Sequence, residues 1–120
     1  MSRNRASAKS AGARFETLVA DHLAKHIDDR IERRKSNGIN DRGDIGGLRH
    51  MGGRIVVEVK DYGGRLLPGP WTDEADIERG NDDAVAGIVV AKRRGETDPD
   101  DQFVLMTVAD LIGLLTGERP

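Results

Sequence analysis

The chain has 120 residues, of which 33% are charged and 3% aromatic, and its formal net charge at pH 7 is -2. It contains no cysteine, which excludes disulfides, thiolate zinc sites and cysteine nucleophiles, and no apolar run approaches the roughly 18 residues of a membrane span. The length fits one domain with its own hydrophobic core. The first residues lack the apolar stretch of a secretory signal, so we expect a cytoplasmic protein.

The small net charge hides an uneven distribution along the chain. Residues 1–65 carry 14 Lys/Arg and 9 Asp/Glu, a net +5, whereas residues 66–120 carry 5 and 12, a net -7. A polarised surface of this kind favours binding of a polyanion on one side. On charge alone, a solvated mixture of charges explains the pattern equally well.

The first quarter of the chain divides into a basic segment and an amphipathic one. Residues 1–12 are rich in Ser, Ala, Lys and Arg without an apolar period, which predicts a mobile basic arm before a single domain of residues 13–120. A helix is predicted over residues 14–27, because its apolar side chains form one continuous arc at 100° per residue. Glu16 is the exception, a carboxylate inside this arc. His22 and His26 have the spacing of metal ligands but no third ligand, so we expect them to pack.

In the central part of the chain, the pattern of residues is typical of β-strands. Strands are predicted over residues 30–34, 44–49 and 54–60, and the last is the clearest because Ile55, Val57 and Val59 alternate with Val56, Glu58 and Lys60. Glycines between the second and third segments favour a β-hairpin turn.

The last part of the chain predicts two more strands and two helices. A helix begins with Thr72 as its N-cap, and strands over residues 86–91 and 102–107 and a helix over 108–116 follow it. The order α-β-β-β-α-β-β-α predicts an α/β domain with a central mixed β-sheet flanked by helices.

The residues that point to chemistry lie on two predicted strands. Glu58 and Lys60 share one face of their strand, and a hairpin brings Asp44 alongside Glu58. Paired carboxylates suit Mg²⁺, which prefers hard oxygen ligands. Lys60 would then orient or deprotonate a water, or balance the charge of a phosphate. If the first helix packs on the sheet, Glu16 reaches the same cluster.

Each of these features also has an ordinary structural explanation. A Glu-x-Lys triplet on a strand is usually a solvated face with a weak ion pair. An aspartate beside a glycine is usually a turn residue, and a glutamate near the start of a helix is often a boundary residue. Their joint occurrence in one order, within a basic half of the chain, favours a functional site.

Glu16, the segment Arg42-Gly43-Asp44-Ile45-Gly46-Gly47 and the segment Val57-Glu58-Val59-Lys60 together resemble the motifs of the PD-(D/E)xK nuclease superfamily. The leading glutamate and the short chain resemble, within it, the archaeal-type Holliday junction resolvases and their phage relatives. The resemblance spans residues 14 to about 107 and agrees with the αβββαβ core of the family, so it implies a restriction-endonuclease-like core. Gly43 departs from the pattern, because the superfamily name has proline there.

The resemblance implies a Mg²⁺-dependent endodeoxyribonuclease, with Mn²⁺ as a substitute. Asp44 and Glu58 would be metal ligands together with the backbone carbonyl of Val59, Lys60 would be the catalytic lysine, and Glu16 would complete the metal site. Attack on phosphorus in line with the 3′ oxygen needs no covalent enzyme intermediate. The resemblance also implies a homodimer, because symmetric cutting of two strands needs two sites, in a bacterium or a phage-infected cell.

The partner expected from this resemblance is DNA, most specifically a branched four-way junction. One Trp, one Tyr and two Phe disfavour recognition by base stacking, so binding is expected to depend on DNA backbone and shape. Two alternatives stay open: another nuclease of the superfamily, of restriction or repair type, and a non-catalytic DNA-binding module of the same fold. The basic residues predicted to contact phosphates are Arg3, Arg5, Lys9, Arg14, Arg33, Arg34, Lys35, Arg42 and Arg65.

Overall fold

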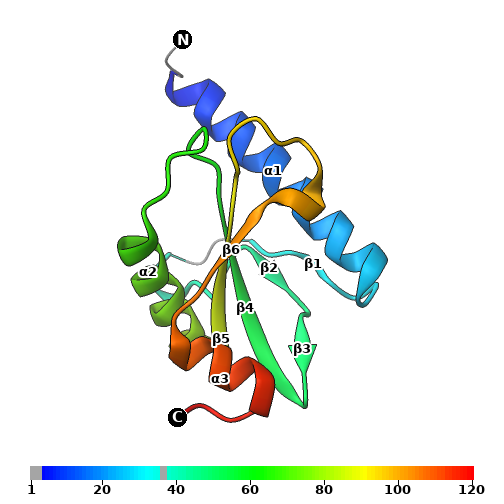
Figure 1. The fold of residues 1–120 in the computed structure, drawn as a ribbon, viewed down its shortest axis with the longest axis vertical. Coiled ribbons are helices and arrows are strands. Elements are labelled where there is room, and N and C mark those ends of the chain that lie inside the picture. The colour runs from blue at the N-terminus through cyan, green and yellow to red at the C-terminus, as the bar shows by residue number, and fades with distance from the viewer. Residues whose placement is uncertain (1–3, 36–37) are drawn as a thin grey trace.

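A computed structural model describes residues 4–35 and 38–120, and it forms an α/β domain with a mixed sheet and three helices (Figure 1). Two short 3-10 turns, η1 (Gly38–Asn40) and η2 (Pro99–Asp101), interrupt the connections between these elements. The helices and strands, in chain order, are α1 (Arg5–His26), β1 (Glu32–Arg33), β2 (Ile45–Gly46), β3 (Arg49–His50), β4 (Gly53–Lys60), α2 (Pro68–Asn81), β5 (Ala86–Ala91), β6 (Phe103–Leu105) and α3 (Val108–Thr116).

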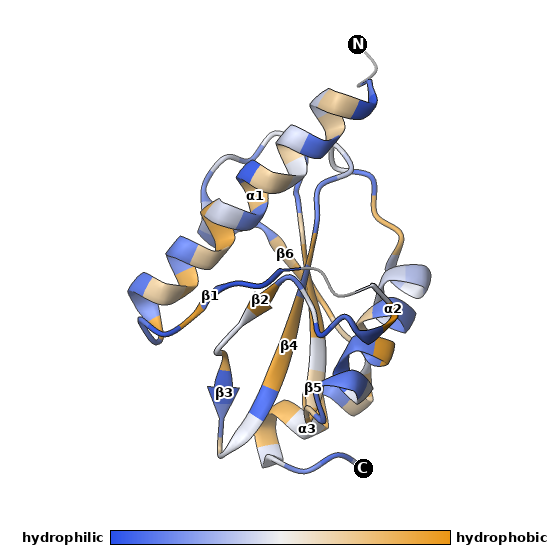
Figure 2. Ribbon diagram, turned by 180° about the vertical axis from the view of Figure 1, so that it is seen from behind, coloured by the Kyte–Doolittle hydropathy of each residue, from blue (hydrophilic) through white to orange (hydrophobic). Residues whose placement is uncertain are grey.

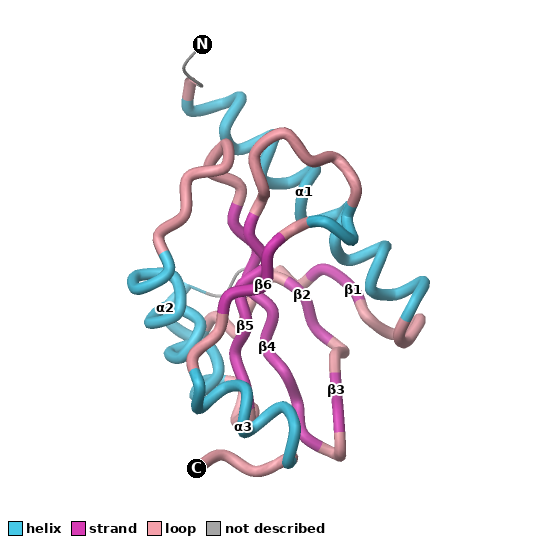
Figure 3. The backbone as a smooth tube through the Cα atoms, in the orientation of Figure 1, coloured by secondary structure: helices cyan, strands magenta, loops and turns pink. Residues whose placement is uncertain are grey.

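The strand order in the sheet is β1-β2-β4-β5-β6, and β3 pairs with β4 off this path (Figure 3). β4 and β5 are parallel and the other pairs are antiparallel, so the predicted mixed sheet flanked by helices is confirmed. The predicted strand over residues 44–49 is instead two short strands. Gly47 has a φ of +90°, which no extended strand contains, and this residue separates β2 from β3.

The structure differs from the predicted mobile arm at the start of the chain. α1 begins at Arg5, where Asn4 caps it by accepting a hydrogen bond of 2.8 Å from the Ser7 amide. The alanines and lysine that follow are good helix formers, and this outweighs the lack of an apolar period; residues 1–3 lie outside the described part of the chain. At the other end of α1, His22 Nε2 lies 2.6 Å from Asp100 Oδ1, which joins the helix to η2.

The second helix also begins earlier than predicted. α2 starts at Pro68 rather than after Thr72, because proline is well suited to the first turn of a helix, where no amide donor is needed. Trp71 is therefore a helical residue, and its side chain is 3% exposed. The Thr72 hydroxyl donates back to the Pro68 carbonyl at 2.7 Å instead of capping the helix.

The two faces of the sheet are covered by different helices, and much of β4 and β5 between them is hydrophobic (Figure 2) and buried. On one face, Phe15 and Val19 of α1 pack with Val57 and Ile88. On the other, a smaller core joins Trp71 and Ala75 of α2 to Val89 and Ala91 of β5. Because side chains alternate along a strand, Glu58 and Lys60 of β4 belong to the α2 face.

α2 lies unusually close to β5. A β-carbon on Gly87 would lie 2.7 Å from the Ala75 carbonyl oxygen, so only glycine allows this approach. The short separation brings the side chains of α2 over the middle of β4. Within the described ranges, no helix is both long enough and apolar enough to cross a membrane.

Asp110 joins α3 to the start of β5. Its carboxylate caps α3 through Thr107, accepts a hydrogen bond from the Gly87 amide at 3.1 Å and pairs with Arg119. The residue is 2% exposed. Burial tends to raise its pKa, but the hydrogen bonds from Arg119 and Gly87 outweigh this and lower the pKa.

We predict that Asp110→Asn lowers the free energy of unfolding by about 2–4 kcal/mol at pH 7, because it breaks the buried ion pair with Arg119 and leaves that arginine with the exposed Asp76 as its carboxylate partner. Because the pKa of Asp110 is lower in the folded state than in the unfolded state, the ionised carboxylate stabilises the folded protein above the unfolded-state pKa. This stabilisation is lost as the pH falls toward the folded-state pKa. The difference between wild type and variant should therefore shrink below about pH 4. Urea unfolding at pH 7 and pH 3.5 measures it, with the exposed Asp101→Asn as control, and an effect that does not change with pH would contradict it.

Candidate metal centre

The pairing of β2 with β4 places Asp44 and Glu58 on one face of the sheet. Ile45 pairs with Val57, and the same antiparallel register puts Asp44 opposite Glu58. The Asp44 amide donates to the Val57 carbonyl at 2.9 Å, and its Oδ2 accepts from the Val59 amide at 2.8 Å. One backbone and one side-chain hydrogen bond to the neighbouring strand therefore hold Asp44 beside Glu58.

The residue before Asp44 explains the departure from the Pro-Asp pattern. Gly43 is buried and has a φ of +95°, whereas the ring of proline fixes φ near -65°. A β-carbon at this position would also lie 2.7 Å from Val56 Cγ1. The backbone that places Asp44 at the sheet therefore requires glycine at position 43.

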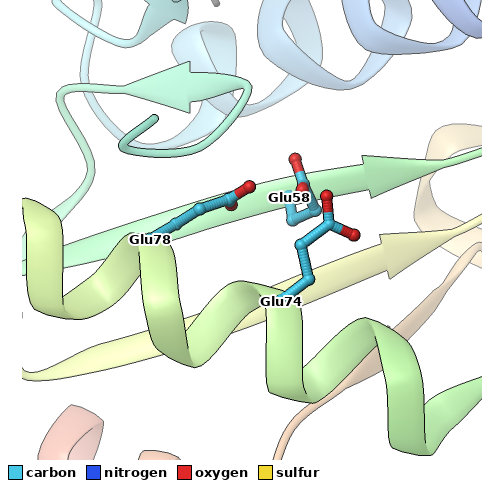
Figure 4. Close-up of side chains that lie close together, drawn as sticks. All are labelled: Glu58, Glu74 and Glu78. Carbon is cyan, nitrogen blue, oxygen red and sulfur yellow. The ribbon is translucent and has the colours of Figure 1, made fainter. Parts of the chain in front are cut away.

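Two glutamates of α2 complete a cluster around Glu58 that the sequence did not predict. Glu74 and Glu78 lie one turn apart on α2 and their carboxylates converge on that of Glu58 (Figure 4). One oxygen from each of the three carboxylates lies within 4.8 Å of the others. Glu58 and Glu78 are buried and Glu74 is exposed. This cluster of carboxylates could hold a metal ion.

Lys60 lies between these carboxylates as an ammonium ion. Its Nζ is 2.7 Å from Glu74 Oε2 and 3.8 Å from Glu58 Oε2. Burial tends to lower the pKa of Lys60, but the hydrogen bond to Glu74 and the attraction of Glu58 outweigh it, so the pKa is raised. A protonated lysine suits charge balance better than proton abstraction, the two roles that the sequence left open.

The buried carboxylates hold protons more tightly than ordinary glutamates. Burial raises the pKa of Glu58, and the adjacent carboxyl groups of Asp44 and Glu78 raise it further. Burial also raises the pKa of Glu78 to about 7. Among the residues that the structure describes, no donor hydrogen-bonds to Glu78 Oε2.

Glu16, the predicted helix carboxylate, lies near this site but outside the three-glutamate cluster. Burial raises its pKa, and repulsion by Asp44 raises it further, so the two carboxylates are in electrostatic contact. Its Oε2 pairs with Arg33 at 2.8 Å. The structure thus brings Asp44, Glu58, Val59 and Lys60 together, with Glu16 at the margin of the group.

The predicted DNA-binding residues fall into two groups. Arg5, Lys9 and Arg14 are exposed along α1, and Arg65 lines an open pocket of about 640 Å³ between α1 and the loop after β4, together with Lys60. The second group comprises Arg33, Arg34 and Arg42, which pair with carboxylates of the domain, and Lys35, which is exposed. Arg3 lies outside the described residues.

The carboxylates of the site are hard oxygen ligands of the kind that Mg²⁺ and Mn²⁺ bind, so the residues present fit such an ion. Glu74 and Glu78 carried one signal in the sequence, their i, i+4 spacing on a predicted helix. Only the packing of that helix shows that they face β4.

Comparison with models of protein families, with curated proteins and with solved structures finds no match.

We predict that Glu78→Gln raises the free energy of unfolding of the metal-free protein by about 2–3 kcal/mol at pH 8, because it removes a buried carboxylate from beside Glu58 and Asp44. The folded-state pKa of Glu78 is raised from 4.5 to about 7, so the stability of the wild type falls as pH rises across this interval. The advantage of the variant should be small at pH 5 and full at pH 8.

Urea unfolding in the presence of EDTA at both pH values measures this effect. Asp73→Asn, which removes an exposed carboxylate from the same helix, is the matched control and should change stability by less than about 0.5 kcal/mol. A Glu78→Gln variant that is less stable than wild type at pH 8 would contradict the prediction.

Proposed function

We propose that this protein is a divalent-metal-dependent endonuclease with a restriction-endonuclease-like fold, and that its substrate is a four-way DNA junction. The observation that carries this proposal is the placement of Asp44, Glu58 and Lys60 on one face of the sheet. Asp44 is hydrogen-bonded to the strand that holds Glu58, and the Lys60 ammonium lies 3.8 Å from Glu58 Oε2.

Asp44, Glu58 and the Val59 carbonyl would hold a Mg²⁺ or Mn²⁺ ion, with Glu16 near Asp44 as an outer carboxylate. Such an ion supplies stabilisation of the negative charge that develops on a phosphate during hydrolysis. The residues of the chain provide the rest. The Lys60 ammonium donates hydrogen bonds to a phosphate oxygen, and the Asp44 side chain keeps its orientation because the Val59 amide holds it.

The approach of DNA is supported by the charges around the pocket beside Lys60. This pocket opens between the first turns of α1 and the loop after β4, and Arg65 lines it. Arg5, Lys9 and Arg14 continue the positive charge along the exposed side of α1. A sugar-phosphate backbone that follows this path would be bound by charge, which suits recognition of DNA shape.

A homodimer is part of the proposal, because a junction is resolved by two symmetric cuts. The surface that supports it is the outer side of α3 with the neighbouring edge strand β6. Val108, Leu111, Ile112 and Leu115 follow the i, i+3, i+4, i+7 spacing of one helix face, and each is at least 40% exposed. A second copy of the chain would bury this apolar face against the same face of its partner.

We predict that the purified protein with Mg²⁺ cleaves a four-way junction at least about tenfold faster than a linear duplex of the same arm sequence. Lys60→Ala and Asp44→Asn should each lower the rate by about 10²–10³-fold, because each removes a group that contacts the phosphate or holds the ion. Lys25→Ala, which removes an exposed lysine at the far end of α1, should leave the rate unchanged.

Gel electrophoresis of end-labelled DNA measures the cleavage. Equal rates on both substrates would remove the junction assignment and retain a nuclease of restriction or repair type. Binding without any cleavage would overturn the enzymatic proposal in favour of a DNA-binding module.

A further inference from the structure

We propose that Glu58, Glu74 and Glu78 form a second divalent-cation position, between β4 and α2 and distinct from the one that Asp44 and Glu58 would form. This inference builds on the proposed nuclease, whose first ion needs no residue of α2. Glu58 is common to both positions. Its carboxylate would therefore face Asp44 on one side and the two helical glutamates on the other.

The geometry of the three glutamates is that of a cation site. They come from one strand and from two successive turns of one helix, and one oxygen of each lies within 4.8 Å of the other two. Carboxylates of like charge repel one another at such distances. The packing of α2 on β5 through Ala75 and Gly87 nevertheless brings them together.

An independent observation concerns the second oxygen of Glu78. The residue is 4% exposed, and within the described part of the chain its Oε2 has no hydrogen-bond partner. Figure 4 shows its carboxylate directed toward Glu58. A buried acceptor without a partner is destabilising, and a cation bound between the three carboxylates would satisfy this oxygen.

The charges around the cluster favour the cation. Other buried carboxylates of the domain have cationic partners: Arg34 and Arg42 pair with Asp82, and Arg119 pairs with Asp110. By contrast, Lys60 is the sole cation that pairs with Glu58 and Glu74 among the described residues, and no ion pair is formed there by Glu78. A divalent ion would supply the missing positive charge.

The experiment that tests this site counts Mn²⁺ ions on the full-length, metal-free protein by electron paramagnetic resonance at pH 8. We expect two ions for wild type, one for Glu78→Gln, one for Asp44→Asn and none with measurable affinity for Glu58→Gln. The affinity of the ion lost in Glu78→Gln should fall at least about tenfold. Asp73→Asn, which removes an exposed charge from the same helix, should retain both ions.

The outcomes separate this inference from the proposed function. One ion in wild type that is lost in Asp44→Asn and retained in Glu78→Gln overturns the second position and leaves the nuclease in place. One ion that requires both Asp44 and Glu78 also overturns it, because a single composite site would then exist. Glu74→Gln, at an exposed position, is the second variant if Glu78→Gln does not fold, and it should lose the same ion.

Discussion

The carboxylate of Glu58, which is buried between β4 and α2, is the constraint on which the rest of the site depends. Parallel pairing with β5 fixes the strand, and the antiparallel register with β2 brings Asp44 to the same face. The Val59 amide then holds the Asp44 side chain at 2.8 Å. Backbone hydrogen bonds, rather than loops, position these two groups, and sites built on such elements are the more rigid ones.

The same burial brings several carboxylates together in this region at an electrostatic cost. Asp110 and Asp82 are buried as well, and each pairs with an arginine that is distant in the sequence or follows the helix. The group around Glu58 has several carboxylates and one lysine. Repulsion between these carboxylates lowers the free energy of unfolding, and destabilising arrangements of this kind are typical of sites that bind a ligand. A bound cation would offset the repulsion, so metal binding should stabilise the folded state.

The asymmetric charge of the chain corresponds to a division of the surface. Arg65 lines the pocket next to Lys60, and Arg5, Lys9 and Arg14 are exposed on α1. By contrast, Arg34 and Arg42 stabilise the domain by pairing with Asp82. Counting charges along the sequence cannot make this distinction, because it depends on which carboxylate lies within reach of each arginine. The acidic second half includes Glu74 and Glu78, which face inward at the site.

The sequence by itself determined the mixed α/β architecture and the common face of Glu58 and Lys60, because alternation along a strand is a local property. The position of Asp44 opposite Glu58 depends on the register between β2 and β4, which is a long-range pairing. The sequence also placed β5 and α3 correctly, because a short apolar run and a helical apolar period are local patterns as well. The start of α1 and of α2 depended on capping and on proline, which outweighed the apolar pattern. Only the tertiary structure decided that Glu74 and Glu78 join Glu58. Their position follows from the close approach of α2 to Gly87, a long-range contact that spacing along the chain does not encode.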